Sequence, residues 1–329
     1  MSATATPPAT PPATRSRSAL RRFDLAWLSE NGVYLALVLV ILLNLVITRN
    51  LVTPEGLRTQ LVQAVPVVIV ALGMALVIGT EGVDLSVGSV MAISAAVLPL
   101  YLGYGWVVGV VAAVFTGVAT GLLAGALVAF VGVQPIVATL AILVGGRGLA
   151  VVIGGGTQKQ IIEPTLLSFG NGTVVGIPYT VILAAVLSIL IGLLVRFTTF
   201  GRRVVAIGGN RVASQLAGLP VRRTLMTVYV ISGVLAAIAG VVATARLTAS
   251  TPNNLGNLIE LSAITAVVVG GTPLTGGRVR ILGTLAGALL MQLIRATLIS
   301  HDLPDSTAQM VQAGIIVIAI YLQLVRRRA

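Results

Sequence analysis

The sequence predicts an all-α polytopic membrane protein with about ten transmembrane helices, some of them broken or re-entrant. Of its 329 residues, 57% are hydrophobic and 9% are charged, and the mean hydropathy is +1.04. A soluble chain has about a quarter of its residues charged, whereas about 20 consecutive apolar residues can cross a bilayer. Ten apolar runs are the predicted spans: Val33–Thr48, Leu61–Ile78, Val87–Leu102, Trp106–Val131, Pro135–Ile153, Tyr179–Phe197, Leu225–Ala243, Ile259–Val269, Ile281–Ile299 and Ala308–Leu324.

The N-terminal segment, residues 1–30, is expected to be a disordered basic tail. Met1–Thr14 is rich in Ala, Thr and Pro, and arginines at positions 15, 17, 21 and 22 follow it; such a composition is typical of disorder. No small-residue cleavage pattern closes the first apolar run, so we do not expect a cleavable signal peptide. Residues 31–329 are then expected to form a single transmembrane domain.

A polar joint separates the second and third apolar runs. Thr80–Ser89 reads Thr-Glu-Gly-Val-Asp-Leu-Ser-Val-Gly-Ser and holds two of the nine carboxylates of the chain. We expect Gly82, Asp84, Ser86 and Gly88 to form a hinge and cap, because a carboxylate favours a helix N-terminus. Contact of Asp84 with a substrate is the less favoured alternative.

The eighth run, Ile259–Val269, is shorter than the roughly 17 residues that a full crossing needs. A broken or re-entrant helix is therefore expected there, as in many transporters. Polar side chains in or beside the spans could bind a neutral solute, although hydrogen bonds between helices are their commoner role; they are Asn44, Gln134, Thr139, Asn253, Asn254, Glu260 and Gln292. Arg147 and Arg295 also lie within spans and need partners, for which Glu81 and Glu260 are the candidates.

Residues 198–224 form a polar loop that is expected to contain a short helix. Gly208-Gly209-Asn210 turns the chain, Asn210 is a good N-cap for a helix over Arg211–Ala217, and Gly218 is a good terminator. Such a helix has the shape that a groove on another protein could bind. It could also simply link two spans.

Arginines cluster in the N-terminal tail, in the 198–224 loop and at the C-terminus. The positive-inside rule places all three clusters in the cytoplasm, which ten spans allow, and leaves the loop Gly154–Gly176 outside. Because no aromatic residues are interleaved with these arginines, nucleic acid is not an expected partner.

Catalysis by this chain is not expected. It has no cysteine and one histidine, His301, whose neighbour Asp302 is more consistent with a solvated pair than with a catalytic dyad. No phosphate-binding loop of the Gly-x-x-x-x-Gly-Lys-Ser/Thr type occurs, so ATP would have to be bound by a partner subunit. We predict no catalytic residue, metal site or bound cofactor.

Several of these motifs resemble bacterial ABC-transporter permeases for monosaccharides, the ribose, xylose, arabinose and galactofuranose group. Gly82–Ser89 is similar to the family's Gly-Ile-Asp-Leu-Ser-Val-Gly signature, and Phe200–Leu219 resembles its Gly-Gly-Asn…Ala…Gly segment, which docks on the ATP-hydrolysing subunit. The other matching segments are Gln134–Leu140, Gly146–Gly148, Val268–Arg278 and, closest to the galactofuranose type, Pro252–Asn254 with Glu260. Two positions depart from the pattern: Arg211, often acidic in relatives, and Thr80-Glu81, which replaces a glycine-rich lead.

The resemblance implies a type II ABC importer-like fold and a permease subunit that moves a pentose or hexose, including furanose forms, across the bacterial inner membrane. The implied partners are an ATP-binding subunit, a second permease copy or paralogue and a periplasmic or lipid-anchored sugar-binding protein, with membrane lipid around them. Coupling to the ATPase then falls on Arg202, Gly209, Asn210, Ala213 and Gly218. The alternative is an ion-coupled secondary transporter of a small polar solute, since broken helices and membrane carboxylates occur there too.

Overall fold

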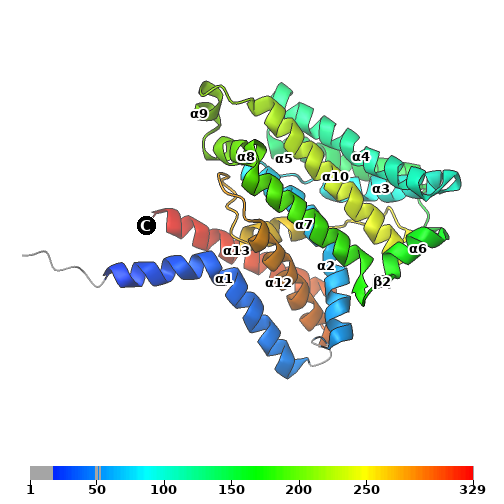
Figure 1. Ribbon diagram of the computed structural model, residues 1–329, viewed down its shortest axis with the longest axis horizontal. Helices are drawn as coiled ribbons and strands as arrows, with labels where there is room; N and C mark the ends of the chain where they lie inside the picture. The colour runs from blue at the N-terminus through cyan, green and yellow to red at the C-terminus, as the bar shows by residue number, and fades with distance from the viewer. Residues whose placement is uncertain (1–17, 49–50, 52, 329) are drawn as a thin grey trace, which may run out of the picture. The chain divides into compact units, whose positions relative to one another are not determined.

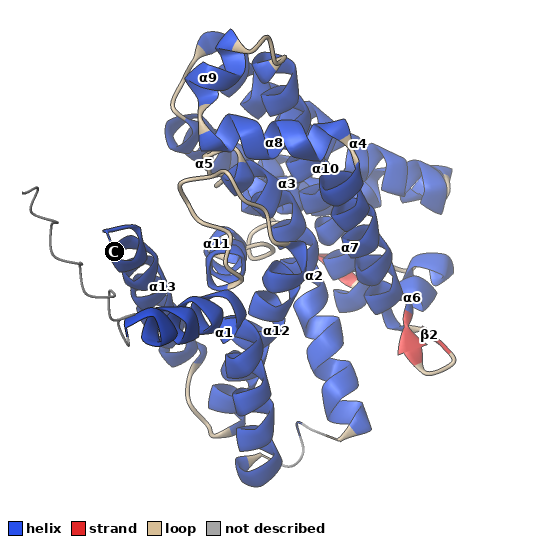
Figure 2. Cartoon of the chain, turned by 60° about the vertical axis from the view of Figure 1, so that its left-hand side comes forward, coloured by secondary structure: helices blue, strands red, loops and turns tan. Residues whose placement is uncertain are grey.

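The computed structural model describes residues 18–48, 51 and 53–328, which are mostly helical (Figure 2). The helices of ten or more residues are α1 (Ser18–Ile47), α2 (Pro54–Gly79), α3 (Val87–Tyr101), α4 (Trp106–Ala126), α5 (Pro135–Gly154), α7 (Tyr179–Phe197), α8 (Thr199–Gly209), α10 (Val221–Leu247), α11 (Ile259–Val269), α12 (Ile281–Ser300) and α13 (Asp305–Arg328). Shorter helices are the 3₁₀ turn η2 (Leu102–Tyr104), the π-helix η3 (Leu127–Val131), α6 (Pro164–Asn171) and α9 (Arg211–Leu216). The chain separates into two compact units, Met1–Gly32 and Val33–Ala329, and the second holds every element from α2 onward.

The predicted spans and the helices agree closely. Seven helices in the described chain are long and apolar enough to cross a membrane, and Tyr179–Phe197 and Ile259–Val269 have the predicted bounds. The helix α11 is short, as expected, at 11 residues. Helices also occupy the first and tenth predicted spans, and ten crossings remains a prediction.

Several boundaries differ from the prediction because helices continue beyond their apolar residues, with the largest differences at the starts of α1 and α2. Residues 18–30, expected to be part of a disordered tail, are helical in α1, where Ala, Leu and Arg favour a helix; residues 1–17 lie outside the described chain. The helix α2 begins at Pro54 rather than Leu61, because Thr53 caps it by accepting a hydrogen bond from the amide of Gly56 at 3.1 Å.

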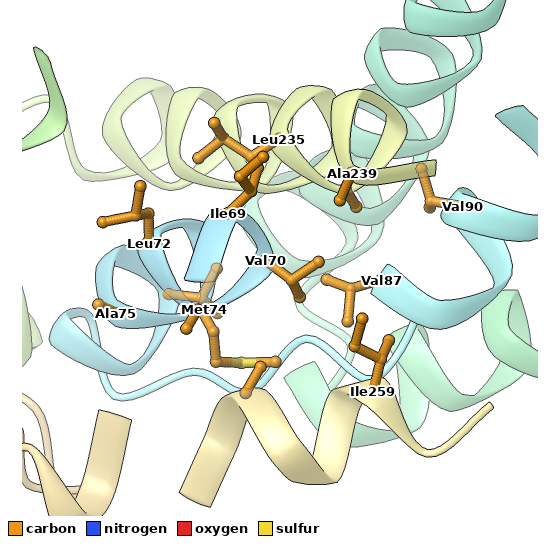
Figure 3. Close-up of a cluster of buried hydrophobic side chains, with 14 of the residues drawn as sticks. Ile69, Val70, Leu72, Met74, Ala75, Val87, Val90, Leu235, Ala239 and Ile259 are labelled. Atoms are coloured by element: carbon orange, nitrogen blue, oxygen red, sulfur yellow. The ribbon is translucent and has the colours of Figure 1, made fainter. Parts of the chain in front are cut away.

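Helices α2 and α10 form the centre of the second unit. Every residue from Val68 to Thr80 is buried, and a helix that is apolar on all sides is typical of a buried position. Figure 3 shows α2 side chains packed against Leu235 and Ala239 of α10, Val87 of α3 and Ile259 of α11. By contrast, less than a third of the most apolar part of α4, α5 and α7 is buried, which leaves long apolar faces for lipid or a partner.

Glycines allow the closest helix contacts, and these contacts lie within the chain. A Cβ added at Gly117 would lie 2.2 Å from the carbonyl oxygen of Gly233, and one at Gly121 would lie 2.6 Å from that of Tyr229. The small-residue face of α4 is therefore packed on α10 (Figure 1).

Two short antiparallel ladders organise the loop that follows α5. The strand β1 (Lys159–Gln160) pairs with β4 (Ala249–Ser250) after α10, while β2 (Thr173–Val174) pairs with β3 (Ile177–Pro178). The first pair joins this loop to the end of α10.

Candidate functional site

The joint between α2 and α3 is held by a buried carboxylate. Asp84 Oδ1 accepts hydrogen bonds from the amide and hydroxyl of Ser86, and Oδ2 accepts one from the hydroxyl of Ser232 in α10 at 2.7 Å. Ser86, not Asp84, occupies the N-cap position of α3, so Asp84 fixes the turn before the helix and ties it to α10. Burial raises the pKa of the Asp84 carboxyl above its ordinary value, although the hydrogen bonds from Ser86 and Ser232 oppose the rise.

Glu81, in the same joint, has a positive φ of 65°. This left-handed conformation favours glycine. This conformation is a physical reason why glycine is common just before the motif in the permeases that the sequence resembles.

Helices α3 and α11 meet through their N-termini. A Cβ added at Gly88, in the first turn of α3, would lie 2.6 Å from the carbonyl oxygen of Gly256 and 2.6 Å from Glu260 Oε2. In Figure 3, the side chains of Val87 and Ile259 lie close together beside Val70 of α2. Both helices are short, with 15 and 11 residues, and both direct the positive ends of their dipoles toward this place. Of the two, α11 is too short to cross a membrane, as discontinuous helices are.

Arg147 of α5 joins this meeting point. Its Nη1 and Nη2 donate to the carbonyl oxygens of Leu255 and Gly256, the latter at 2.6 Å. A Cβ at Gly88 would lie 3.1 Å from Nη2, so the guanidinium is also close to Glu260. Glu260 is 7% exposed, and within the described chain its Oε2 has no hydrogen-bond partner.

The partners expected for the two arginines need correction. Arg147 binds backbone carbonyls rather than Glu81, and Glu260 acts on it only through its nearby charge. Arg295 pairs with Asp305 at 2.7 Å, not with Glu81 or Glu260. The reason is connectivity, because a short turn brings the start of α13 back to the end of α12.

The other predicted substrate residues do not converge on one place. Gln134 is exposed just before α5, and Asn254 is exposed in the turn before α11. Thr139 is buried and donates to the carbonyl of Pro135 at 2.9 Å, and Asn253 donates to that of Gly156 at 3.2 Å. Their observed contacts are therefore structural, and their roles in a substrate path stay predictions.

Gln292 of α12 has partners that the sequence did not indicate. Its Nε2 donates to the Oε1 atoms of both Gln60 and Gln63 in α2, each at 2.9 Å. Amide residues at helical spacing on α2 were a signal available in the sequence. Asn44 of α1 accepts a hydrogen bond from the hydroxyl of Thr297 in α12 at 2.9 Å.

The 198–224 loop contains two helices, α8 and α9, that follow α7 at one end of the bundle (Figure 1). Asn210 Oδ1 accepts from the amide of Ala213 at 2.9 Å, as expected for the N-cap of α9, and Gly218 has the positive φ of 76° expected of a terminator. Because α8 continues to Gly209, the turn begins at Asn210 rather than at Gly208. Arg202, Asn210 and Ala213 are exposed.

The apolar residues of α9 face outward. Leu216 is 84% exposed and Val212 is 68% exposed. They are four residues apart, so they lie on one face of the helix.

Three turns meet at what we call the glycine junction, which consists of Gly79, Gly208, Gly276 and Gly277. A Cβ added at Gly208 would lie 1.9 Å from the carbonyl oxygen of Gly79, to which the amide of Gly277 donates at 3.1 Å. A Cβ at Gly276 would lie 2.8 Å from the amide nitrogen of Glu81. Helix α8 therefore contacts the joint before α3 and the loop before α12 through backbone atoms. The sequence had pointed to Gly209, whose own Cβ position is open.

Comparison with known proteins gives consistent matches over most of the chain. Residues 56–320 match the family described as the branched-chain amino acid transport system permease component. The chain is 40% identical over 263 residues to the galactofuranose transporter permease protein YtfT of Escherichia coli K12, which covers 79% of this chain and 77% of that protein. It is 39% identical over 275 residues to the fructose import permease protein FruF of Bifidobacterium longum, covering 81% and 77% of the two chains.

A third relative covers nearly the whole chain. The ribose import permease protein RbsC of Escherichia coli K12 is 36% identical over 313 residues, or 93% of this chain and 97% of that protein. No solved structure matches the chain.

Proposed function

The chain belongs to the permease family of bacterial monosaccharide ABC importers, and from that premise we propose that residues 198–224 couple it to a separate ATP-binding subunit. It is the transmembrane permease subunit of such an importer and a multi-pass protein of the bacterial inner membrane. Family membership confirms the prediction made from the motifs. The alternative, an ion-coupled secondary transporter, is not supported, because the relatives are ABC importer permeases.

The observation that carries the proposal is the exposed apolar face of α9. Burying an exposed apolar side chain is favourable, and docking into a groove on another protein would bury Leu216 and Val212. The sequence has no phosphate-binding loop of its own, so the energy for transport must enter through a contact with another subunit.

The glycine junction supports a route for that energy. Because these backbones touch with no side chains between them, α8 has little room to move independently of the turn after α2 and the loop before α12. A movement of α8 would therefore act on the N-terminal turn of α3, where Asp84 and Gly88 link it to α10 and α11.

Charge supports placing α8 and α9 in the cytoplasm. Their neighbourhood carries Arg202, Arg203, Arg211, Arg222 and Arg223, whereas the loop with α6 at the other end of α7 carries Lys159 alone as a cation. Both termini would then be cytoplasmic, and the α6 loop would face an external sugar-binding protein.

The relatives named above carry galactofuranose, fructose and ribose, so we propose a monosaccharide of that size as the cargo. The external binding protein would select among such sugars. A second permease copy or a paralogue would complete the path, which fits the large apolar faces that α4, α5 and α7 leave exposed.

The test is a charge placed on the docking face. We expect Leu216→Asp to abolish most of the sugar-stimulated ATP hydrolysis of the assembled complex, because a carboxylate would have to be desolvated in the groove. Co-purification of the ATP-binding subunit should fall in parallel. Gln215→Asp is the matched control, since Gln215 is exposed on the same helix and is already polar, so its carboxylate would replace no apolar contact. Equal hydrolysis in the two variants would contradict the assignment.

A further inference from the structure

A cavity of about 190 Å³ lies between α11, α12 and α13, next to Val67 of α2. Its polar lining is unusual for a chain in which 9% of residues are charged and 57% hydrophobic. Amide side chains enter it from three elements: Asn257 from the turn before α11, Gln292 from α12, and Gln309 and Gln312 from α13. Ser262 of α11 adds a hydroxyl.

The depth of Gln292 places this cavity inside the membrane rather than at its surface. Gln292 lies eight residues before the end of α12 at Ser300, which is about 12 Å along a helix. Polar side chains at such depth are costly, and they normally face a water-filled space that serves transport.

Hydrogen bonds orient two of these amides, Gln292 and Gln309. Gln60 and Gln63 bind Nε2 of Gln292, and within the described chain no bond uses its Oε1. Gln309 Nε2 donates to Asp305 Oδ2 at 3.1 Å, while Asp305 Oδ1 accepts from Arg295 at 2.7 Å. Side chains that are already oriented lose little conformational entropy when a ligand binds.

The chemistry of the lining selects a neutral polyhydroxyl ligand. An amide offers both a donor and an acceptor, as a sugar hydroxyl does, and the one ion pair in the wall is internally neutral. We propose that this cavity is an intramembrane subsite for the transported monosaccharide. The proposal rests on the proposed function, because only a subunit that conducts sugar needs such a site.

The subsite also adjoins the meeting point of α3 and α11. Asn257 follows Gly256, whose carbonyl oxygen accepts a hydrogen bond from Arg147, and Glu260 directly precedes the cavity residue Leu261. A movement of α3 transmitted by Gly88 would therefore displace the wall that carries Asn257.

Because the chain has no cysteine, a single introduced thiol is the only one in the permease that the reagent can modify. Ala313→Cys places the thiol in the cavity wall, where Ala313 is exposed and makes no side-chain hydrogen bond. Ser306→Cys is the matched control, because Ser306 is exposed on the same helix outside the lining. Each variant is assembled with its ATP-binding subunit and its external sugar-binding protein in proteoliposomes. It is then treated with a charged methanethiosulfonate, with and without D-ribose, D-fructose or D-galactose.

We expect both thiols to react, and a transported sugar at twice its dissociation constant to slow the reaction of Ala313→Cys about threefold, with Ser306→Cys unchanged. The subsite alone is overturned if the parent complex transports a sugar that protects neither thiol or both equally, or if Ala313→Cys does not react. Absence of transport for every sugar overturns the proposed function and the subsite with it.

A second measurement uses loss of a single amide. Asn257→Ala should lower the transport rate at limiting sugar about fivefold, the effect of one hydrogen bond, with unchanged thermal stability. Ser306→Ala, which removes an exposed polar side chain of α13 outside the lining, is the control and should change nothing. An Asn257→Ala variant that transports at the parent rate, or whose loss follows a lower melting temperature, contradicts the proposal.

Discussion

At the residue scale, Arg147 organises the meeting point of α3 and α11. Its guanidinium satisfies two carbonyls that precede α11 and offsets the charge of Glu260, whose Oε2 is otherwise unpartnered in the described chain. Removing one member of such a cluster leaves buried polar groups without partners, which costs more than the bonds themselves contribute. Arg295 makes the contrasting case, because its ion pair with Asp305 is largely exposed.

We therefore expect Arg147→Gln to lower the free energy of unfolding by about 2–3 kcal/mol, since charged hydrogen bonds are lost and carbonyls are left unpaired. Arg295→Gln should cost less than about 1 kcal/mol, the usual value of an exposed ion pair. Thermal unfolding of the two variants in the same detergent gives the comparison. An equal loss of stability in the two variants would show that the hydrogen bonds of Arg147 to buried carbonyls stabilise the protein no more than an exposed ion pair does.

At the element scale, contacts between turns decide how the helices communicate. Helix α8 touches the turn after α2 and the loop before α12 at the glycine junction, and α3 touches the turn before α11 at Gly88. None of these contacts leaves room for a side chain. A methyl group at either place would have to move a whole element rather than a neighbouring rotamer.

Neighbouring glycines of α8 provide a matched test of the junction. Gly208→Ala should destabilise the protein by about 1–3 kcal/mol, because its methyl group would overlap the carbonyl of Gly79. Gly209→Ala should be neutral or slightly stabilising, since its Cβ meets nothing within 4 Å and alanine favours a helix. The melting temperatures of the two variants check this, and a stable Gly208→Ala would rule out the close contact.

At the scale of the whole molecule, burial separates a central pair of helices from those that face outward. The helices α2 and α10 are buried over most of their apolar length, and α4, α5 and α7 are not. The asymmetric arginines, rather than burial, predict which ends of the helices lie on the cytoplasmic side of the membrane.

Single thiols test that orientation directly. In intact spheroplasts, we expect a membrane-impermeant maleimide to label Val175→Cys, because the α6 loop would be external. Leu216→Cys should react only after the membrane is permeabilised, although Leu216 is 84% exposed. The reverse pattern would invert the topology and remove α9 from the reach of a cytoplasmic ATPase.

The sequence by itself determined the membrane class, the family and most helix bounds. Span length is set by bilayer thickness, so hydropathy along the chain is enough to locate helices such as α7 and α11. Caps are equally local, which is why Asn210 and Gly218 could be assigned from their neighbours.

Only the tertiary structure decided which distant groups meet. Arg147 binds carbonyls 108 and 109 residues away, and every residue carries a carbonyl, so no residue type signals that choice. Gly208 differs from Gly209 only in what lies opposite it, and the amides of the cavity come from three separate elements. Local propensity and hydropathy place helices along the chain, but packing between helices creates the sites.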